Sequence, residues 1–164
     1  IHERLVGSEM CIRDRDYYLV VLDYDLNHNR DVLSAIQNKA DKVEILVNEV
    51  CYPNCPKRSE HYRQQSQMQL EYDINTAFPC PNKVKERKFA DCMDRPSFIS
   101  NEQIQDYIDK GFVNFKIVGR GMPLDFVKES CLYYLVKDEC RDFIRGKMDS
   151  TLNQFAQAMK QRKK

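Results

Sequence analysis

The sequence predicts an α/β fold with parallel strands and a helical C-terminal part. Three short apolar runs, at residues 17–22, 43–47 and 112–118, alternate with stretches of helical periodicity. Continuous apolar runs of this length are typical of strands that are buried on both faces of a sheet. Strand–helix–strand units with short connections require a parallel pair and a right-handed crossover.

The composition is that of a folded domain. The chain has 164 residues, of which 42% are hydrophobic and 31% are charged. This balance excludes a disordered chain, and no apolar run approaches the ~20 residues that a membrane helix needs. The formal net charge of +1 creates no overall field that would attract nucleic acid. We therefore expect a single domain that does not span a membrane.

Residues 1–15 differ from the rest of the chain. They show neither a helical nor a strand period, and the string from Ser8 to Arg15 resembles a translated sequencing adapter. We expect this segment to be a non-native or disordered leader, and the native N-terminal part to be missing. A natural disordered terminus is the alternative.

The segment 17–47 predicts the first strand–helix–strand unit. A strand at 17–22 ends in a polar stretch that contains Asp23, Asp25 and His28. Asn29 can cap a helix that runs to about residue 40 and has one apolar face. The strand at 43–47 follows directly.

A long polar segment separates this unit from the last strand. Residues 56–74 can form an exposed helix, whereas residues 75–98 contain two cysteines and several prolines without any period. A loop of this length inside a compact domain needs something to hold it in place, and a metal site would do so.

The last strand is framed by clear helix signals. Ser100 and Gln103 form a capping-box pattern for a helix that ends at Gly111. A strand at 112–118 follows, and Pro123 stands where proline can begin the next helix.

Two further helices are expected at 139–148 and 150–161. The basic tail at 160–164 is interpreted as a solvated helix end rather than an RNA contact. Three parallel strands cannot close a barrel, which takes eight. The chain is thus either a small open sheet or part of a larger barrel, and the irregular N-terminal residues favour the second interpretation. We predict a partial α/β barrel over 16–149, with a cysteine-bearing loop at 50–98, followed by a helix and tail at 150–164.

Seven cysteines occur in a chain whose first residues show no secretion signal. In a reducing cytoplasm, where we place the protein, thiols more often bind metals or act in catalysis than form disulfides. Four converging thiolates hold Zn²⁺ or an iron–sulfur cluster. The predicted ligands are Cys51, Cys55, Cys80 and Cys92. The alternative is that these cysteines are unrelated.

Polar residues at the ends of the strands are candidates for catalysis or binding, because ligands bind at the carboxyl edge of parallel sheets. Asn48 and Glu49 follow the second strand, and Arg120 follows the third. A guanidinium binds a carboxylate or phosphate with two hydrogen bonds. His61 can approach the cysteines as a ligand or an acid–base group. The plain alternatives are a solvated histidine, an ordinary strand-to-helix turn and helix capping.

Three short motifs are similar to those of a known family and occur in the same order. They are VVL with DL at 20–26, EILV followed by Cys51, and FKIVGR at 115–120. On these motifs the chain resembles the peptidase U32 (collagenase-like) family across residues 19–136. The cysteine spacing differs from that of the family, and Val118 stands where the family has glutamate.

The resemblance implies a TIM-barrel-like fold in which four cysteines hold a [4Fe–4S] cluster. Family members are named peptidases, and several take part in oxygen-independent hydroxylation of RNA bases or ubiquinone precursors. A first hypothesis is therefore a cluster-dependent enzyme that acts on RNA or a small aromatic compound with a redox partner, and in which Arg120 binds an anionic group.

Two other functions stay open. The thiolates could hold Zn²⁺ only to fold the segment 50–98 of a binding module. The chain could also be a U32-type peptidase, although the sequence shows no convincing nucleophile–base pair and no HExxH zinc motif.

Overall fold

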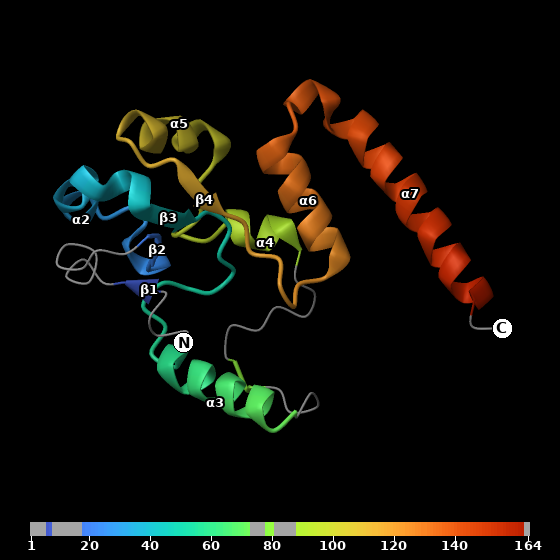
Figure 1. Ribbon diagram of the computed structural model, residues 1–164, viewed down its shortest axis with the longest axis horizontal. Coiled ribbons are helices and arrows are strands. Elements are labelled where there is room, and N and C mark those ends of the chain that lie inside the picture. The colour runs from blue at the N-terminus through green and yellow to red at the C-terminus, as the bar shows by residue number, and fades with distance from the viewer. Residues whose placement is uncertain (1–5, 8–17, 73–77, 81–87, 163–164) are drawn as a thin grey trace.

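The structure is a computed structural model that describes residues 6–7, 18–72, 78–80 and 88–162. Its described residues form a four-stranded parallel sheet in the order β1-β2-β3-β4 (Figure 1). The strands are β1 (Val6–Gly7), β2 (Val20–Leu22), β3 (Val43–Leu46) and β4 (Asn114–Lys116). The prediction of an α/β fold with parallel strands is confirmed, and the arrangement corresponds to part of a β/α fold.

The central strands β2 and β3 are buried, as their apolar sequences predict. Val20 lies opposite Val43 in the pairing of β2 with β3, and both side chains are buried. Ile45 of β3 lies opposite Phe115 of β4. The sheet therefore places the carboxyl ends of β2, β3 and β4 at one common edge.

The strand β4 is shorter than the run at 112–118 suggests. Phe112 precedes the strand and is fully buried in the core. Val118 follows the strand, and its N–H donates to the side chain of Asn48 instead of to a neighbouring strand. The two ends of the run therefore have other roles than strand pairing: Phe112 packs in the core, and the backbone N–H of Val118 bonds to the side chain of Asn48.

The helix expected at 29–40 is divided into two parts. Asn29 caps α2 (Arg30–Ala35) by accepting a hydrogen bond from the N–H of Val32 at 3.1 Å. The chain then continues as the 3₁₀ helix η3 (Gln37–Lys42), with a non-helical residue at Lys39. The predicted cap is confirmed, and the continuous helix is replaced by a kinked pair.

The capping box of α5 (Asn101–Asp109) is present as predicted. The side chain of Ser100 accepts from the N–H of Gln103, whose side chain accepts in return from the N–H of Ser100. Gly111 ends the helix with φ of +93°, a conformation that glycine adopts without steric cost.

The polar segment contains two helices. α3 (Arg58–Leu70) agrees with the exposed helix expected at 56–74, and none of its residues is buried. The short helix α4 (Phe89–Met93) lies in the stretch for which no period was found, and it buries Phe89 and Cys92.

The C-terminal part consists of α6 (Leu124–Leu135), the 3₁₀ helix η4 (Asp138–Cys140) and α7 (Arg141–Arg162). Pro123 is the N-cap of α6, as expected. The two helices expected at 139–148 and 150–161 form one continuous helix, and the hydroxyl of Thr151 donates to the carbonyl of Lys147 within it. Figure 1 shows α7 extending away from the sheet.

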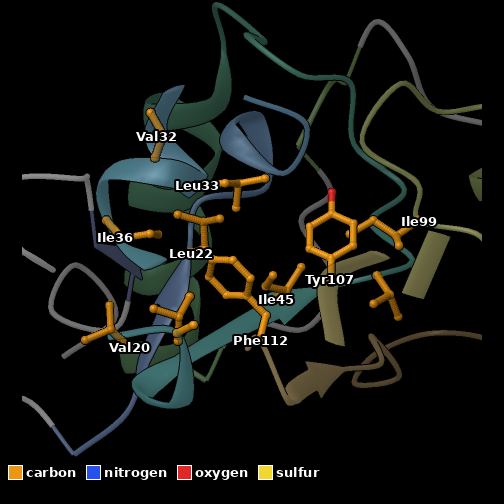
Figure 2. Packing of buried hydrophobic residues seen from close by; sticks show 12 residues of the cluster. Val20, Leu22, Val32, Leu33, Ile36, Ile45, Ile99, Tyr107 and Phe112 are labelled. Atoms are coloured by element: carbon orange, nitrogen blue, oxygen red, sulfur yellow. The ribbon is translucent and has the colours of Figure 1, made fainter. Parts of the chain in front are cut away.

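The main core packs around the sheet, α2 and α5 (Figure 2). Its buried members are Val20, Leu22, Val32, Leu33, Ile36, Ala40, Val43, Ile45, Val47, Ile99, Tyr107 and Phe112. In Figure 2 the ring of Phe112 lies among side chains that include Leu22 and Ile45. A second cluster of buried residues joins α4 to α6 through Phe89, Cys92, Phe98 and Phe126. Burial of this kind contributes about 25 cal/mol per Å² of apolar surface.

Part of the expected leader lies among the described residues. Val6 and Gly7 lie in the segment expected to be a leader, and they pair in parallel with Val21 and Leu22. The rest of that segment, residues 1–5 and 8–15, lies outside the described residues, so the expectation stays a prediction. In the part of the chain that the structure describes, no helix is long and apolar enough to cross a membrane.

Candidate functional site at the carboxyl edge of the sheet

The cysteine-bearing loop begins at Asn48, where the chain leaves β3. Asn48 is fully buried. Its Oδ1 accepts from the N–H of Val118 at 2.6 Å, and its Nδ2 donates to Ser130 Oγ at 3.1 Å and to the carbonyl of Val118 at 3.3 Å. The amide thus links β3 to the end of β4 and to α6. This use of its polar groups supports a structural role for Asn48, which the sequence had suggested as a catalytic candidate.

Glu49 shapes the start of the loop. Its Oε1 accepts hydrogen bonds from the backbone N–H groups of Val50, at 2.8 Å, and Cys51, at 2.9 Å. After burial, the charge of Glu49 is one of the causes that raise the pKa values of Tyr24 and Cys92. Glu49 therefore lies within electrostatic reach of both Tyr24 and Cys92.

The first of these, the Arg58 cluster, consists of Asp23, Tyr24, Asp25, Arg58 and Tyr62. Arg58 begins α3, and its Nη1 donates to Asp23 at 2.8 Å and to Asp25 at 3.0 Å. Its guanidinium lies 4.2 Å from the ring centroid of Tyr24 and 5.5 Å from that of Tyr62. Burial acts to lower the pKa of Arg58, but the hydrogen bond to Asp23 and the surrounding groups outweigh it and raise that pKa. The cluster joins the polar helix α3 to the end of β2.

Two buried polar atoms of the Arg58 cluster have no hydrogen-bond partner among the described residues. They are the hydroxyl of Tyr24 and Oδ1 of Asp25. Burial raises the pKa of Tyr24 above its ordinary value, so its hydroxyl stays protonated at neutral pH. A buried donor without a partner is costly, and functional sites are one of the places where such groups are found.

The second cluster, the Arg95 cluster, consists of Val50, Tyr52 and Arg95. Arg95 follows α4, and its Nε donates to the carbonyl of Val50 at 2.9 Å. Its guanidinium lies 3.9 Å from the ring centroid of Tyr52. Arg95 is only 9% exposed, whereas Tyr52 is 41% exposed. The two ends of the cysteine-bearing loop, around residues 50 and 95, are thereby joined to each other.

The four predicted ligand cysteines lie in different environments. Cys51, Cys55 and Cys80 are half-buried, whereas Cys92 is fully buried. The thiol of Cys92 donates to the carbonyl of Phe89 at 2.9 Å, and burial raises its pKa to about 12. At neutral pH, Cys92 is therefore a protonated thiol in this arrangement.

A metal centre is not assembled among the described residues. Within residues 6–7, 18–72, 78–80 and 88–162, no group of three or more His, Cys, Asp or Glu side chains is arranged to hold a metal ion. Thiolates are the correct donors for zinc or an iron–sulfur cluster. The donor chemistry therefore fits, but the arrangement of the donors does not, and metal binding by these cysteines stays a prediction.

Three other residues that the sequence suggested, His61, Arg120 and His28, belong to neither the Arg58 cluster nor the Arg95 cluster. The ring of His61 stacks on that of Phe78, with the centroids 4.4 Å apart. Arg120 is exposed on the turn between β4 and α6, ahead of Gly121 with φ of +71°. His28 Nε2 lies 2.9 Å from the carbonyl of Phe98. These contacts give no separate support for an acid–base role.

Sequence reasoning missed the roles of Arg95, Tyr24 and Tyr52. Arg95 lies in a stretch without periodicity, and its contact with Val50 spans 45 positions of the chain. For the Arg58 cluster the sequence provided a partial indication, because Asp23 and Asp25 follow the first predicted strand.

Comparison with known proteins finds a related sequence. The chain is 30% identical over 131 residues to an uncharacterized protease of Methanocaldococcus jannaschii. The match covers 74% of the chain and 37% of that protein, so the chain spans much less than the full length of its relative. No protein-family model and no solved structure matches the chain. The match agrees with the resemblance to a peptidase family that the sequence motifs indicate.

Proposed function

We propose that this chain, a divergent relative of U32-type proteases, is part of an enzyme that binds its substrate at the carboxyl edge of the parallel sheet. One observation carries the proposal: residues 50–58, which follow β3 and include Cys51 and Cys55, are held at that edge because Arg95 donates to the carbonyl of Val50 and Arg58 donates to Asp23 after β2. Ligands of β/α folds bind at this edge, on loops that a rigid scaffold positions.

The cysteine-bearing loop is the part of this site that would hold a cofactor. Cys51, Cys55, Cys80 and Cys92 are the residues that we propose as ligands of a [4Fe–4S] cluster, with Zn²⁺ as the alternative. A bound cluster supplies electron transfer. Loading requires Cys92 to give up both its proton and its hydrogen bond to the carbonyl of Phe89, since only a thiolate is a ligand.

The same proposal implies a class of substrate and a cellular compartment. A cluster-dependent U32-like enzyme would modify RNA or a small aromatic compound without oxygen, and it would need a redox partner. Arg120 is exposed and can reach an anionic group of such a substrate. The same proposal places the protein in a reducing cytoplasm, where thiols stay free to bind a cluster.

Anaerobic purification followed by metal analysis tests the cofactor. A brown protein that absorbs in the violet–blue region and contains iron and acid-labile sulfide would support the cluster. A colourless protein with bound zinc would instead support the structural zinc module. A protein that takes up neither metal would overturn both.

Peptidase activity is the second candidate, because the similar protein is named a protease. Hydrolysis of gelatin or casein by the purified chain tests it. Our proposal predicts no cleavage above that of a mock purification. Cleavage that persists after metal removal, and is lost on substitution of one side chain, would establish the peptidase instead.

A further inference from the structure

We propose that Arg95 and Tyr52 form a subsite for a carboxylate group at the edge of the cysteine-bearing loop. The subsite is separate from the proposed metal ligands and does not depend on their being loaded. Its ligand is a small molecule or a substrate group that carries a single carboxylate.

Arg95 is a buried charge that forms no ion pair among the residues that the structure describes. The residue is 9% exposed. None of the ion pairs in the described part of the chain includes it. Buried charges are normally paired, because desolvation without a partner is unfavourable. Arg58, by contrast, is paired with both Asp23 and Asp25.

The guanidinium of Arg95 is held so that one end remains available. Its Nε is used by the carbonyl of Val50, and one face lies against the ring of Tyr52. The two terminal Nη groups have no hydrogen-bond partner among the described residues, yet they are not among the fully buried unpartnered atoms. Both groups therefore keep some exposure to solvent. Tyr52, whose ring covers one face of the guanidinium, is 41% exposed.

The donors of the subsite favour a carboxylate over a phosphate. One guanidinium end matches the two oxygens of one carboxylate in a planar, bidentate pair. A phosphate dianion needs more donors than one guanidinium end provides. The stacked ring of Tyr52 also favours a ligand with a planar or aromatic body.

Nuclear magnetic resonance of the full chain, without added metal, tests the subsite. The Arg95 side-chain Nε–Hε signal, assigned by its loss in Arg95→Lys, is followed during titration with sodium acetate and then sodium benzoate at constant ionic strength. We expect a saturable shift with a dissociation constant on the order of 10 mM for acetate. Benzoate should bind at least as tightly.

Two variants and one control sharpen the test. In Arg95→Lys, followed through the backbone amide of Tyr52, acetate binding should weaken by about tenfold because the bidentate fork is lost. Tyr52→Leu keeps the guanidinium and should weaken benzoate binding more than acetate binding, so it tests the subsite even if Arg95→Lys does not fold. The exposed Arg30 on α2 provides the matched control, Arg30→Lys, which should change nothing.

Three results would overturn the inference. One is the absence of a saturable shift with either carboxylate, and another is an equal loss of binding in Arg30→Lys. The third is inorganic phosphate saturating the Arg95 signal at lower concentration than acetate, which would make the subsite a phosphate site. Because the titration uses no metal, failure of the cluster proposal would not affect its outcome.

Discussion

The sheet region and the cysteine-bearing segment at 50–98 are stabilised in different ways. The sheet region is built around twelve buried core residues from β2, β3, α2, α5 and the chain between them. In the segment, α3 buries no residue at all. α3 is attached to the sheet through Arg58 and its contacts with Asp23 and Asp25.

This difference separates the scaffold from the part that can change. Apolar burial gives the sheet region a stability that is shared among many contacts. Within the segment, α3 is attached by a few polar contacts and can open locally at low free-energy cost, and binding elements are drawn from such regions. A rearrangement that brings the four cysteines together would leave the sheet intact, but it would have to take Cys92 out of the buried cluster that it forms with Phe89, Phe98 and Phe126.

The largest effect is expected from truncating the core beside the sheet. Phe112 is fully buried, so Phe112→Ala should lower the free energy of unfolding by about 3–5 kcal/mol. Urea denaturation followed by circular dichroism measures it. The neighbouring Val113 is 57% exposed, and Val113→Ala should cost less than about 0.5 kcal/mol. Similar costs for the two variants would contradict the description of the core.

A smaller effect is expected at the junction between the two regions. Asn48→Ala leaves the N–H of Val118 without its partner and removes the hydrogen bond that Ser130 Oγ accepts, although that hydroxyl still donates to the carbonyl of Phe126; it should cost about 2–3 kcal/mol. Asn153 is exposed on α7, and Asn153→Ala should be nearly neutral in the same urea experiment. If Asn48→Ala were equally neutral, the amide would not link β3 to β4.

Within the segment, the effect should be local. Arg58→Met removes the contacts of α3 with Asp23 and Asp25, so the amides of α3 should exchange with solvent about tenfold faster. Hydrogen–deuterium exchange with mass spectrometry measures this, while the amides of β3 should be unaffected. Arg63→Met, on an exposed position of the same helix, serves as the control. Faster exchange in β3 would show that the two regions are not independent.

The smallest effect concerns a single thiol and requires no substitution. Because burial raises the pKa of Cys92 to about 12, its thiolate is scarce at pH 8, and its alkylation should lag far behind that of the exposed Cys140. Raising the pH increases the thiolate fraction of Cys92 until the pH passes that pKa. Iodoacetamide labelling with peptide mass spectrometry compares the two rates. Equal rates at pH 8 would mean that Cys92 is not held as a buried thiol.

The sequence predicted best those features that depend on neighbouring residues. The cap at Asn29, the capping box at Ser100 and the helix start at Pro123 were all confirmed, because each needs only a few adjacent positions. The apolar runs predicted the strands of the sheet, although Phe112 is used for core packing rather than for pairing.

The candidate site was less predictable because its contacts join distant parts of the chain. The bond from Arg95 to Val50 spans 45 positions, and that from Asn48 to Val118 spans 70. No local pattern encodes such a pairing. α7 is a different case, because two helices were expected at 139–148 and 150–161 although neither Asp149 nor Ser150 interrupts the single helix.

The central claim is that the cysteine-bearing segment rearranges to gather its thiols around a cluster. Iron content after anaerobic reconstitution, compared between Cys92→Ser and Cys131→Ser, tests this claim most directly. Cys131 lies on α6 and is not a proposed ligand. The account predicts about four iron atoms per chain in the original protein and in Cys131→Ser, and a large loss in Cys92→Ser. Undiminished iron in Cys92→Ser, or no iron in any of the three proteins, would contradict it.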